Sequence, residues 1–133
     1  MGQGRIILVD KNPAAMCGIR RLLEDEVESV LMVGDEISLF HVLENFSPDL
    51  VLADLSFPIS AKTNIGCEIK KGYPKIKVIL LSLHDERSVV DEVMASGVEG
   101  FVLKRRAVID LIPAIREVSQ GGTYVSPDIN ASL

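Results

Sequence analysis

Apolar residues follow two alternating patterns along the chain. Short continuous runs rich in Val, Ile and Leu are too short for helices and are typical of strands buried on both faces of a parallel sheet. Between these runs, apolar residues recur every three or four positions, which predicts amphipathic helices. The runs span residues 6–9, 30–33, 50–53, 78–81 and 101–103. The pattern therefore predicts five strands that alternate with five helices.

Proline and glycine agree with this division. Pro13 suits the first turn of the first helix, with Asn12 as its N-cap. Gly97 and Gly121 follow helical segments, where a C-cap glycine is expected. The alternation of strands and helices predicts βαβ units. We therefore expect an α/β fold with a single doubly wound five-stranded parallel sheet and helices on both faces.

Composition and charge set the class of protein. The 133 residues are 47% apolar, enough to form the core of one domain. We expect a disordered N-terminus over 1–4, a domain over 5–120 and a tail over 121–133. Two cysteines without a CxxC pair argue against a disulfide or metal framework. The net charge of −5 argues against a broad nucleic-acid-binding surface, and no apolar run approaches the length of a membrane span. These features favour a soluble cytoplasmic protein.

Polar residues directly follow four of the apolar runs. Asp10, Asp54, Ser82 and Lys104 end the first, third, fourth and fifth predicted strands. Taken singly, each can be a residue that merely ends a strand. In an open parallel sheet, however, ligands bind at the carboxyl ends of the strands. The four together place two carboxylates, a hydroxyl and an ammonium group along one edge.

This set of groups suits phosphoryl transfer onto a carboxylate. Asp54, on the central strand, can attack phosphorus as a nucleophile and form an acyl phosphate. Asp10 would help to hold a divalent cation such as Mg²⁺, which takes oxygen ligands. Lys104 would supply a fixed positive charge to the phosphoryl oxygens, and the Ser82 hydroxyl would donate a hydrogen bond to them.

The chain resembles a receiver domain of bacterial two-component response regulators, in particular the branch that carries a LuxR/NarL-type helix-turn-helix. The resemblance rests on IILVDKNP at 6–13, PDLVLADLSFP at 48–58, VILLS at 78–82 and GFVLK at 100–104. The stretch GGTYVSP at 121–127 is similar to the point where that branch leaves its receiver for a linker. The resemblance implies the flavodoxin-like strand order 2-1-3-4-5 and an output domain beyond the tail.

The resemblance also implies a role for each site residue. Asp54 is the phosphoacceptor, and Ser82 matches the family's switch hydroxyl. Phe101 matches the switch aromatic, although it also suits a plain core position. The backbone carbonyl of Ser56 matches a ligand of Mg²⁺, beside Asp10 and Asp54. The implied function is a phosphorylation switch, with a histidine kinase or phosphotransfer protein as partner and DNA bound only through the output domain.

Self-association is a further expectation from the resemblance. We expect a homodimer that forms through the last helices and strand five. Val102, Ile109 and the pair Arg105 and Arg106 are the candidate residues at this edge.

One position departs from the family. The first strand of a receiver normally ends in two acidic residues, and the second binds the metal directly, whereas Lys11 follows Asp10 here. A cation at this point should weaken Mg²⁺ binding, and Lys11 would instead pair with Asp54 or Asp10. The alternative function is a pseudo-receiver, an interaction module without Mg²⁺-dependent phosphorylation. The alternative to the pairing of Lys11 with a carboxylate is that its side chain points away from the pocket.

Enzymes on related folds fit less well. A haloacid-dehalogenase-type phosphatase needs a second aspartate two residues after the nucleophile, where Ser56 stands. A flavodoxin needs a phosphate-binding loop after the first strand, and residues 10–13 do not form one. The sequence also lacks a P-loop and a G-x-S-x-G elbow. We therefore do not expect an enzyme.

Overall fold

The structure is a computed structural model that describes residues 3–54, 64–83 and 85–127. Over these residues six parallel strands form one sheet in the order β2-β1-β3-β4-β5-β6. The strands are β1 (Gln3–Val9), β2 (Val27–Val33), β3 (Leu50–Asp54), β4 (Lys77–Ser82), β5 (Gly100–Leu103) and β6 (Tyr124–Val125). The predicted order of the first five strands is confirmed, whereas the predicted number of five was wrong.

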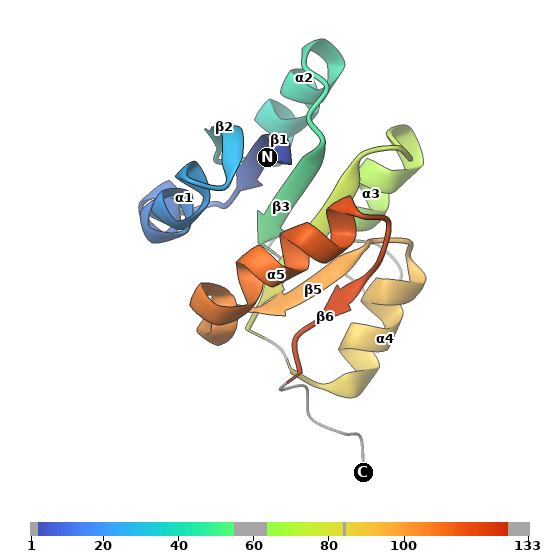
Figure 1. Ribbon diagram of the computed structural model, residues 1–133. Helices are drawn as coiled ribbons and strands as arrows, with labels where there is room; N and C mark the ends of the chain where they lie inside the picture. The colour runs from blue at the N-terminus through green and yellow to red at the C-terminus, as the bar shows by residue number, and fades with distance from the viewer. Residues whose placement is uncertain (1–2, 55–63, 84, 128–133) are drawn as a thin grey trace.

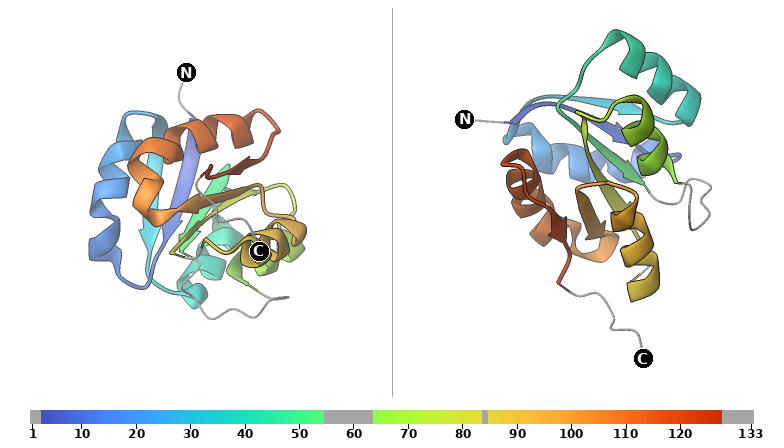
Figure 2. Two further views of the ribbon diagram at one scale, coloured as in Figure 1. Left: turned by 90° about the horizontal axis from the view of Figure 1, so that it is seen from below. Right: turned by 90° about the vertical axis from the view of Figure 1, so that its right-hand side faces the viewer.

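Helices cover both faces of this sheet (Figures 1 and 2). The helices α1 (Cys17–Glu24) and α5 (Ala107–Ser119) pack on one face, and α2 (Glu36–Asn45), α3 (Ile65–Gly72) and α4 (Arg87–Ala95) pack on the other. Two short 3-10 helices, η1 (Pro13–Met16) and η2 (Lys104–Arg106), lead into α1 and α5. The doubly wound arrangement predicted from the alternating pattern is confirmed.

Alternate residues of the strands build two separate cores. In β1, Ile7 and Val9 pack with α2, α3 and α4, whereas Ile6 and Leu8 pack with α1 and α5. Every residue of β3 is buried. Burial on both faces is the physical reason for the continuous apolar runs, since neither face of these strands meets water.

The sixth strand comes from the segment that we expected to be a tail. The edge of β5 has backbone groups that need partners, and the N–H groups of Tyr124 and Ser126 donate to the carbonyls of Glu99 and Phe101 at 3.0 and 2.9 Å. The sheet also begins earlier than expected, because β1 starts at Gln3 within the segment expected to be disordered. Ordered structure therefore extends past the boundaries at 5 and 120.

The extra strand also changes the expected edge for dimerisation. Val102 is completely buried, paired with Leu81 of β4 and packed in the α1–α5 core, so it is not an edge residue. Arg106 points its guanidinium at Asp110 of α5. Ile109 remains an exposed apolar side chain.

The predicted helix ends at two glycines and the predicted N-cap position are confirmed. Gly97 and Gly121 have φ angles of 99° and 96°, the left-handed conformation that glycine adopts most easily. Asn12 stands at the N-cap position of η1, as predicted, but its side chain makes no capping hydrogen bond. Its backbone N–H instead donates to the Asp10 carboxylate at 2.7 Å. Among the described residues, no helix combines the length and apolar character needed to cross a bilayer.

Candidate functional site

Two buried carboxylates meet at the carboxyl ends of the neighbouring strands β1 and β3. Asp54 is the last residue of β3, and Asp10 follows directly after β1. The two strands pair with Val9 opposite Ala53, which brings the next residue of each strand side by side. Asp10 and Asp54 are only 5% and 3% exposed. The sheet register thus places both predicted carboxylates in one pocket.

Lys104 supplies the positive charge of this pocket. It follows the last residue of β5 and opens η2. Its Nζ lies 2.9 Å from Asp54 Oδ2 and 4.0 Å from Asp10 Oδ2. Three residues that are far apart in the sequence are therefore brought together, as the pattern of strand ends predicted.

Ser82 and Phe101 lie on the strands beside this pocket. Ser82 ends β4 and is 1% exposed. The register pairs Asp54 with Leu81 and Ser82 with Leu103, which places Ser82 on the strand between Asp54 and Lys104. Phe101 is fully buried in the core below α2, α3 and α4. Phe101 is thus a core aromatic residue, three positions before Lys104 in the sequence.

Burial and the neighbouring carboxylate make Asp10 costly to ionise. Loss of hydration is the main cause that raises the pKa of Asp10, and the nearby Asp54 carboxylate raises it further. The hydrogen bond from the Asn12 N–H and the charge of Lys104 oppose this rise but do not cancel it. Among the described residues, the Asp10 and Asp54 carboxylates thus lie close enough to repel each other, and the Lys104 ammonium group only partly offsets this repulsion.

The donor set fits a hard divalent cation by its chemistry. Carboxylate oxygens are the ligands that Mg²⁺ prefers, and a cation would relieve the repulsion between the Asp10 and Asp54 carboxylates. Ser56, whose backbone carbonyl is the third expected ligand, lies outside the described residues. Over the described residues no group of three or more His, Cys, Asp and Glu side chains forms a metal site. Within the described part of the chain, Asp10 and Asp54 are therefore the side chains expected to bind a metal here.

Lys11 stands beside these ligands in the sequence. It is exposed at the bend after Asp10. The ion pair that Asp54 makes at 2.9 Å is with Lys104. The pairing of Lys11 with Asp54 or Asp10 stays a prediction.

A second buried polar cluster, which was not predicted from the sequence, lies next to the site. Asp110 of α5 is 2% exposed and interacts with Arg106 and Ser126. One sequence signal could have revealed it. Asp110 lies on the helix face that carries Ala107, Leu111 and Ala114, so an acidic residue occupies an apolar stripe.

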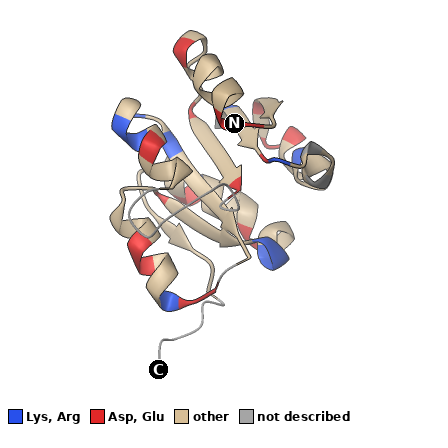
Figure 3. Ribbon diagram, turned by 180° about the vertical axis from the view of Figure 1, so that it is seen from behind, with Lys and Arg blue, Asp and Glu red and all other residues tan. Residues whose placement is uncertain are grey.

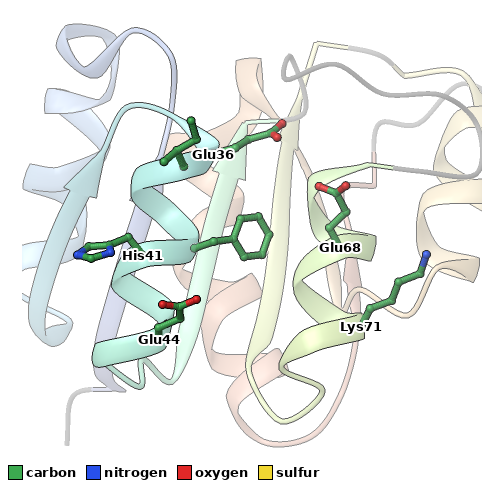
Figure 4. Close-up of a pocket in the computed structure, with 7 residues that line it drawn as sticks. Glu36, His41, Glu44, Glu68 and Lys71 are labelled. Carbon is green, nitrogen blue, oxygen red and sulfur yellow. The ribbon is translucent and has the colours of Figure 1, made fainter.

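A groove between α2 and α3 lies apart from this pocket (Figure 4). Ile37 and Phe40 supply its apolar lining. The labelled Glu44 lies on α2, and the labelled Glu68 and Lys71 lie on α3. The groove contains none of the residues that the sequence predicted for chemistry. The residues predicted for phosphoryl transfer thus gather at the strand ends and not in this groove.

The fold and this residue set match a known family. The family model for the response regulator receiver domain matches residues 6–116. The chain therefore belongs to the response regulator receiver domain family. The LuxR/NarL-type branch that the sequence motifs resemble is also the branch in which its relatives are found.

Two curated relatives illustrate this relationship. The chain is 31% identical over 131 residues to the transcriptional regulatory protein DegU of Brevibacillus brevis, covering 97% of the chain and 56% of that protein. It is 27% identical over 132 residues to the oxygen regulatory protein NreC of Staphylococcus carnosus strain TM300, covering 97% of the chain and 61% of that protein. The chain spans little more than half the length of these relatives.

Solved structures agree with the fold. The REC domain of RcsB from Salmonella enterica serovar Typhimurium, determined with the phosphomimetic BeF3−, has a TM-score of 0.84 and 25% identity, covering 96% of both chains. A LuxR-family response regulator from Aurantimonas sp. SI85-9A1 has a TM-score of 0.85 and 25% identity, covering 96% of this chain and 93% of that one.

Proposed function

We propose that this chain is a phosphorylation switch in which Asp54 accepts a phosphoryl group. The observation that carries the proposal is the buried Asp54 carboxylate with Lys104 Nζ at 2.9 Å and Asp10 beside it, at the strand ends of a receiver fold. Structural ion pairs also occur at buried sites, but this one lies where open parallel sheets bind ligands. Asp10, Ser82 and Lys104 complete the set of groups that the chemistry needs.

The proposed reaction is an in-line transfer to a carboxylate oxygen. An oxygen of Asp54 attacks phosphorus, an O–P bond forms, and the bond between phosphorus and the donor breaks. The donor is the phosphohistidine of a kinase or phosphotransfer protein, or a small acyl phosphate. Lys104 moves its charge from the carboxylate to the phosphoryl oxygens, and Ser82 donates a hydrogen bond to them. Phe101, packed beneath, is the proposed aromatic of the switch.

Asp10 and Asp54, with the Ser56 carbonyl, would hold Mg²⁺ in this reaction. When bound, the cation would neutralise charge that develops on the phosphoryl oxygens. We propose that Lys11 makes this binding weak, because its ammonium replaces a metal-binding carboxylate.

Control of transcription through a separate output domain completes the proposal. Acidic and basic positions are interspersed over the helices of the described residues and do not form one extended basic face (Figure 3). The net charge of −5 is also unfavourable for DNA binding. A relative, RcsB, has been solved as a complex with DNA and as dimers on DNA. DNA binding through an output domain, and a homodimer of this chain, are therefore proposed here by analogy.

Intact-mass spectrometry tests the phosphoacceptor. The wild type should gain the mass of one phosphoryl group when it is incubated with acetyl phosphate and a high Mg²⁺ concentration, whereas Asp54→Asn should gain none. Asp91→Asn, which changes an exposed aspartate of α4, is the matched control and should behave as the wild type. Phosphoryl transfer to Asp54→Asn would overturn the assignment of Asp54, and no transfer to the wild type would favour the pseudo-receiver.

A further inference from the structure

The segment that follows α5 folds back beside β5, the strand that leads to Lys104 (Figure 1). Gly121 lets the chain turn after the helix, and Tyr124 and Val125 then pair with Gly100 and Phe101 of β5. This strand, β6, lies against the strand that leads directly into Lys104. A segment that the sequence assigned to a tail is thus part of the sheet at the site.

Ser126 fastens this segment to the backbone next to Lys104. Its side chain is buried, and the residue is 1% exposed. The N–H of Leu103, the residue before Lys104, donates to Ser126 Oγ at 3.0 Å. The Ser126 hydroxyl in turn donates to Asp110 Oδ2 at 2.8 Å. One hydroxyl therefore connects β5, α5 and the end of β6.

Asp110 fastens the other side of Lys104. Arg106, the last residue of η2, donates to Asp110 from Nε at 2.8 Å and from Nη2 at 3.1 Å. Burial disfavours the charge of Asp110 most strongly, yet hydrogen bonds from Arg106, Ser126 and Tyr124 outweigh it and hold the pKa of Asp110 below its usual value. The carboxylate is therefore charged, and both of its oxygens are used for holding neighbouring segments.

These contacts bracket Lys104 on both sides. Ser126 holds the backbone N–H of Leu103, and Asp110 holds the side chain of Arg106, so contacts on both sides of Lys104 limit the movement of residues 103–106. The lysine side chain is long and flexible and does not select one position by itself. The distance of 2.9 Å between Lys104 Nζ and Asp54 Oδ2 therefore depends on the position of the Lys104 backbone, from which the side chain extends.

We propose that Ser126 and Asp110 are positioning residues for Lys104, and that docking of residues 123–126 is coupled to occupancy of Asp54 by a phosphoryl group. The coupling rests on the proposed function, whereas the positioning does not. A docked segment favours the Lys104 geometry that binds the phosphoryl oxygens. By thermodynamic linkage, phosphoryl occupancy must favour docking by the same factor. Any chain that continues past Pro127 would then start from a point that responds to phosphorylation.

The first experiment measures the position of Lys104 without phosphorylation. The full chain is trace-labelled with acetic anhydride, and the labelling of each lysine is measured by peptide mass spectrometry. Ser126→Ala should raise the labelling of Lys104 several-fold relative to exposed Lys75, because Lys104 loses its fixed place beside Asp54. Ser119→Ala, which changes an exposed serine at the end of α5, is the control and should leave the ratio unchanged.

The second experiment measures the coupling with beryllofluoride and Mg²⁺ as a phosphoryl mimic. Beryllofluoride should slow amide hydrogen exchange at Tyr124 and Ser126 in the wild type. Ser126→Ala should weaken its binding by about fivefold or more, the usual lower range of coupling between linked sites. Ser126→Cys, with a weaker acceptor of similar size, should show a smaller change in the same direction. If Ser126→Ala does not fold, Ser126→Cys takes its place in both experiments.

The outcomes separate the positioning from the proposed function. Unchanged Lys104 labelling in Ser126→Ala and Ser126→Cys overturns the positioning role. Unchanged beryllofluoride affinity and unchanged exchange at Tyr124 and Ser126 overturn the coupling. If the wild type binds no beryllofluoride at all, the proposed function and the coupling both fail. Raised Lys104 labelling in Ser126→Ala would still support the positioning role in that case.

Discussion

Lys11 is the residue that most affects the expected behaviour of the site. It follows Asp10 directly in the sequence, and we propose that its charge lies close to the carboxylates that would bind Mg²⁺. Two unit charges about 4 Å apart interact by roughly 1–4 kcal/mol between the dielectric of water and that of a protein surface, and Mg²⁺ doubles this energy. On this proposal, a repulsion would replace the attraction that a carboxylate at this position would provide.

Lys11→Asp should therefore strengthen Mg²⁺ binding. We expect an increase of at least ten- to a hundredfold, since about 1.4 kcal/mol corresponds to tenfold in affinity. Faster phosphorylation by acetyl phosphate should accompany it. Isothermal titration calorimetry measures the affinity, and Lys11→Met should fall between the wild type and Lys11→Asp because it removes the repulsion without adding a ligand.

Lys75→Asp is the matched control for this substitution. It changes the net charge by the same amount at an exposed position just before β4, at the opposite end of that strand from Ser82. We expect little change in Mg²⁺ affinity. If the wild type binds Mg²⁺ as tightly as Lys11→Asp, the Lys11 side chain points away from the pocket.

At the level of elements, α3 packs unusually close to the sheet through Gly66. A Cβ atom at Gly66 would lie 2.5 Å from Val98 Cγ1 and 3.3 Å from Leu80 Cδ1. A Cβ atom at Gly72, at the end of the same helix, would have no such neighbouring atom within 4 Å and would lie in open space. Close packing therefore requires a glycine at position 66 of α3, whereas it does not require one at position 72.

Alanine substitutions should separate these two glycines. Gly66→Ala should lower the free energy of unfolding by about 1–3 kcal/mol, because the added methyl group overpacks the core. Gly72→Ala should raise it by about 0.4–1 kcal/mol, because alanine restricts the unfolded chain without a clash. Urea unfolding measures both changes. A Gly66→Ala variant as stable as the wild type would mean that α3 can move away from Val98.

At the level of the whole molecule, the two faces of the sheet differ in their exposed apolar residues. Ile109 lies on α5 and is 64% exposed, and its neighbour Val108 is also exposed. Ile37 lies on α2, on the opposite face, and is 85% exposed. Because β6 covers the edge of β5, we place the proposed dimer on the exposed side of α5 and not on the sheet edge.

Sedimentation equilibrium tests this placement. The wild type should self-associate weakly, and beryllofluoride with Mg²⁺ should strengthen the association. Ile109→Glu should weaken it by about tenfold or more, since a charge buried in an interface costs more than 1.4 kcal/mol. Ile37→Glu introduces the same charge on the other face and should have no effect. A strict monomer under all conditions would contradict the proposed homodimer.

Local patterns predicted most of the fold and the candidate site. The strands were visible because burial on both faces leaves continuous apolar runs, such as the fully buried β3. Asp10, Asp54 and Lys104 were grouped from sequence because parallel strands bring their carboxyl ends to one edge. The distances of 2.9 and 4.0 Å from Lys104 to the two carboxylates bear out this grouping.

Tertiary structure alone decided the features that join distant segments. A strand of two residues, Tyr124–Val125, is too short to show a period, and its existence depends on the free edge of β5. The Ser126 contacts with Leu103 and Asp110 cross 23 and 16 residues of sequence, and a serine before a proline shows no local sign of burial. Apolar periodicity is a local consequence of packing and can be read from the sequence, whereas a hydrogen-bond partner is selected only when the folded chain brings the two groups together.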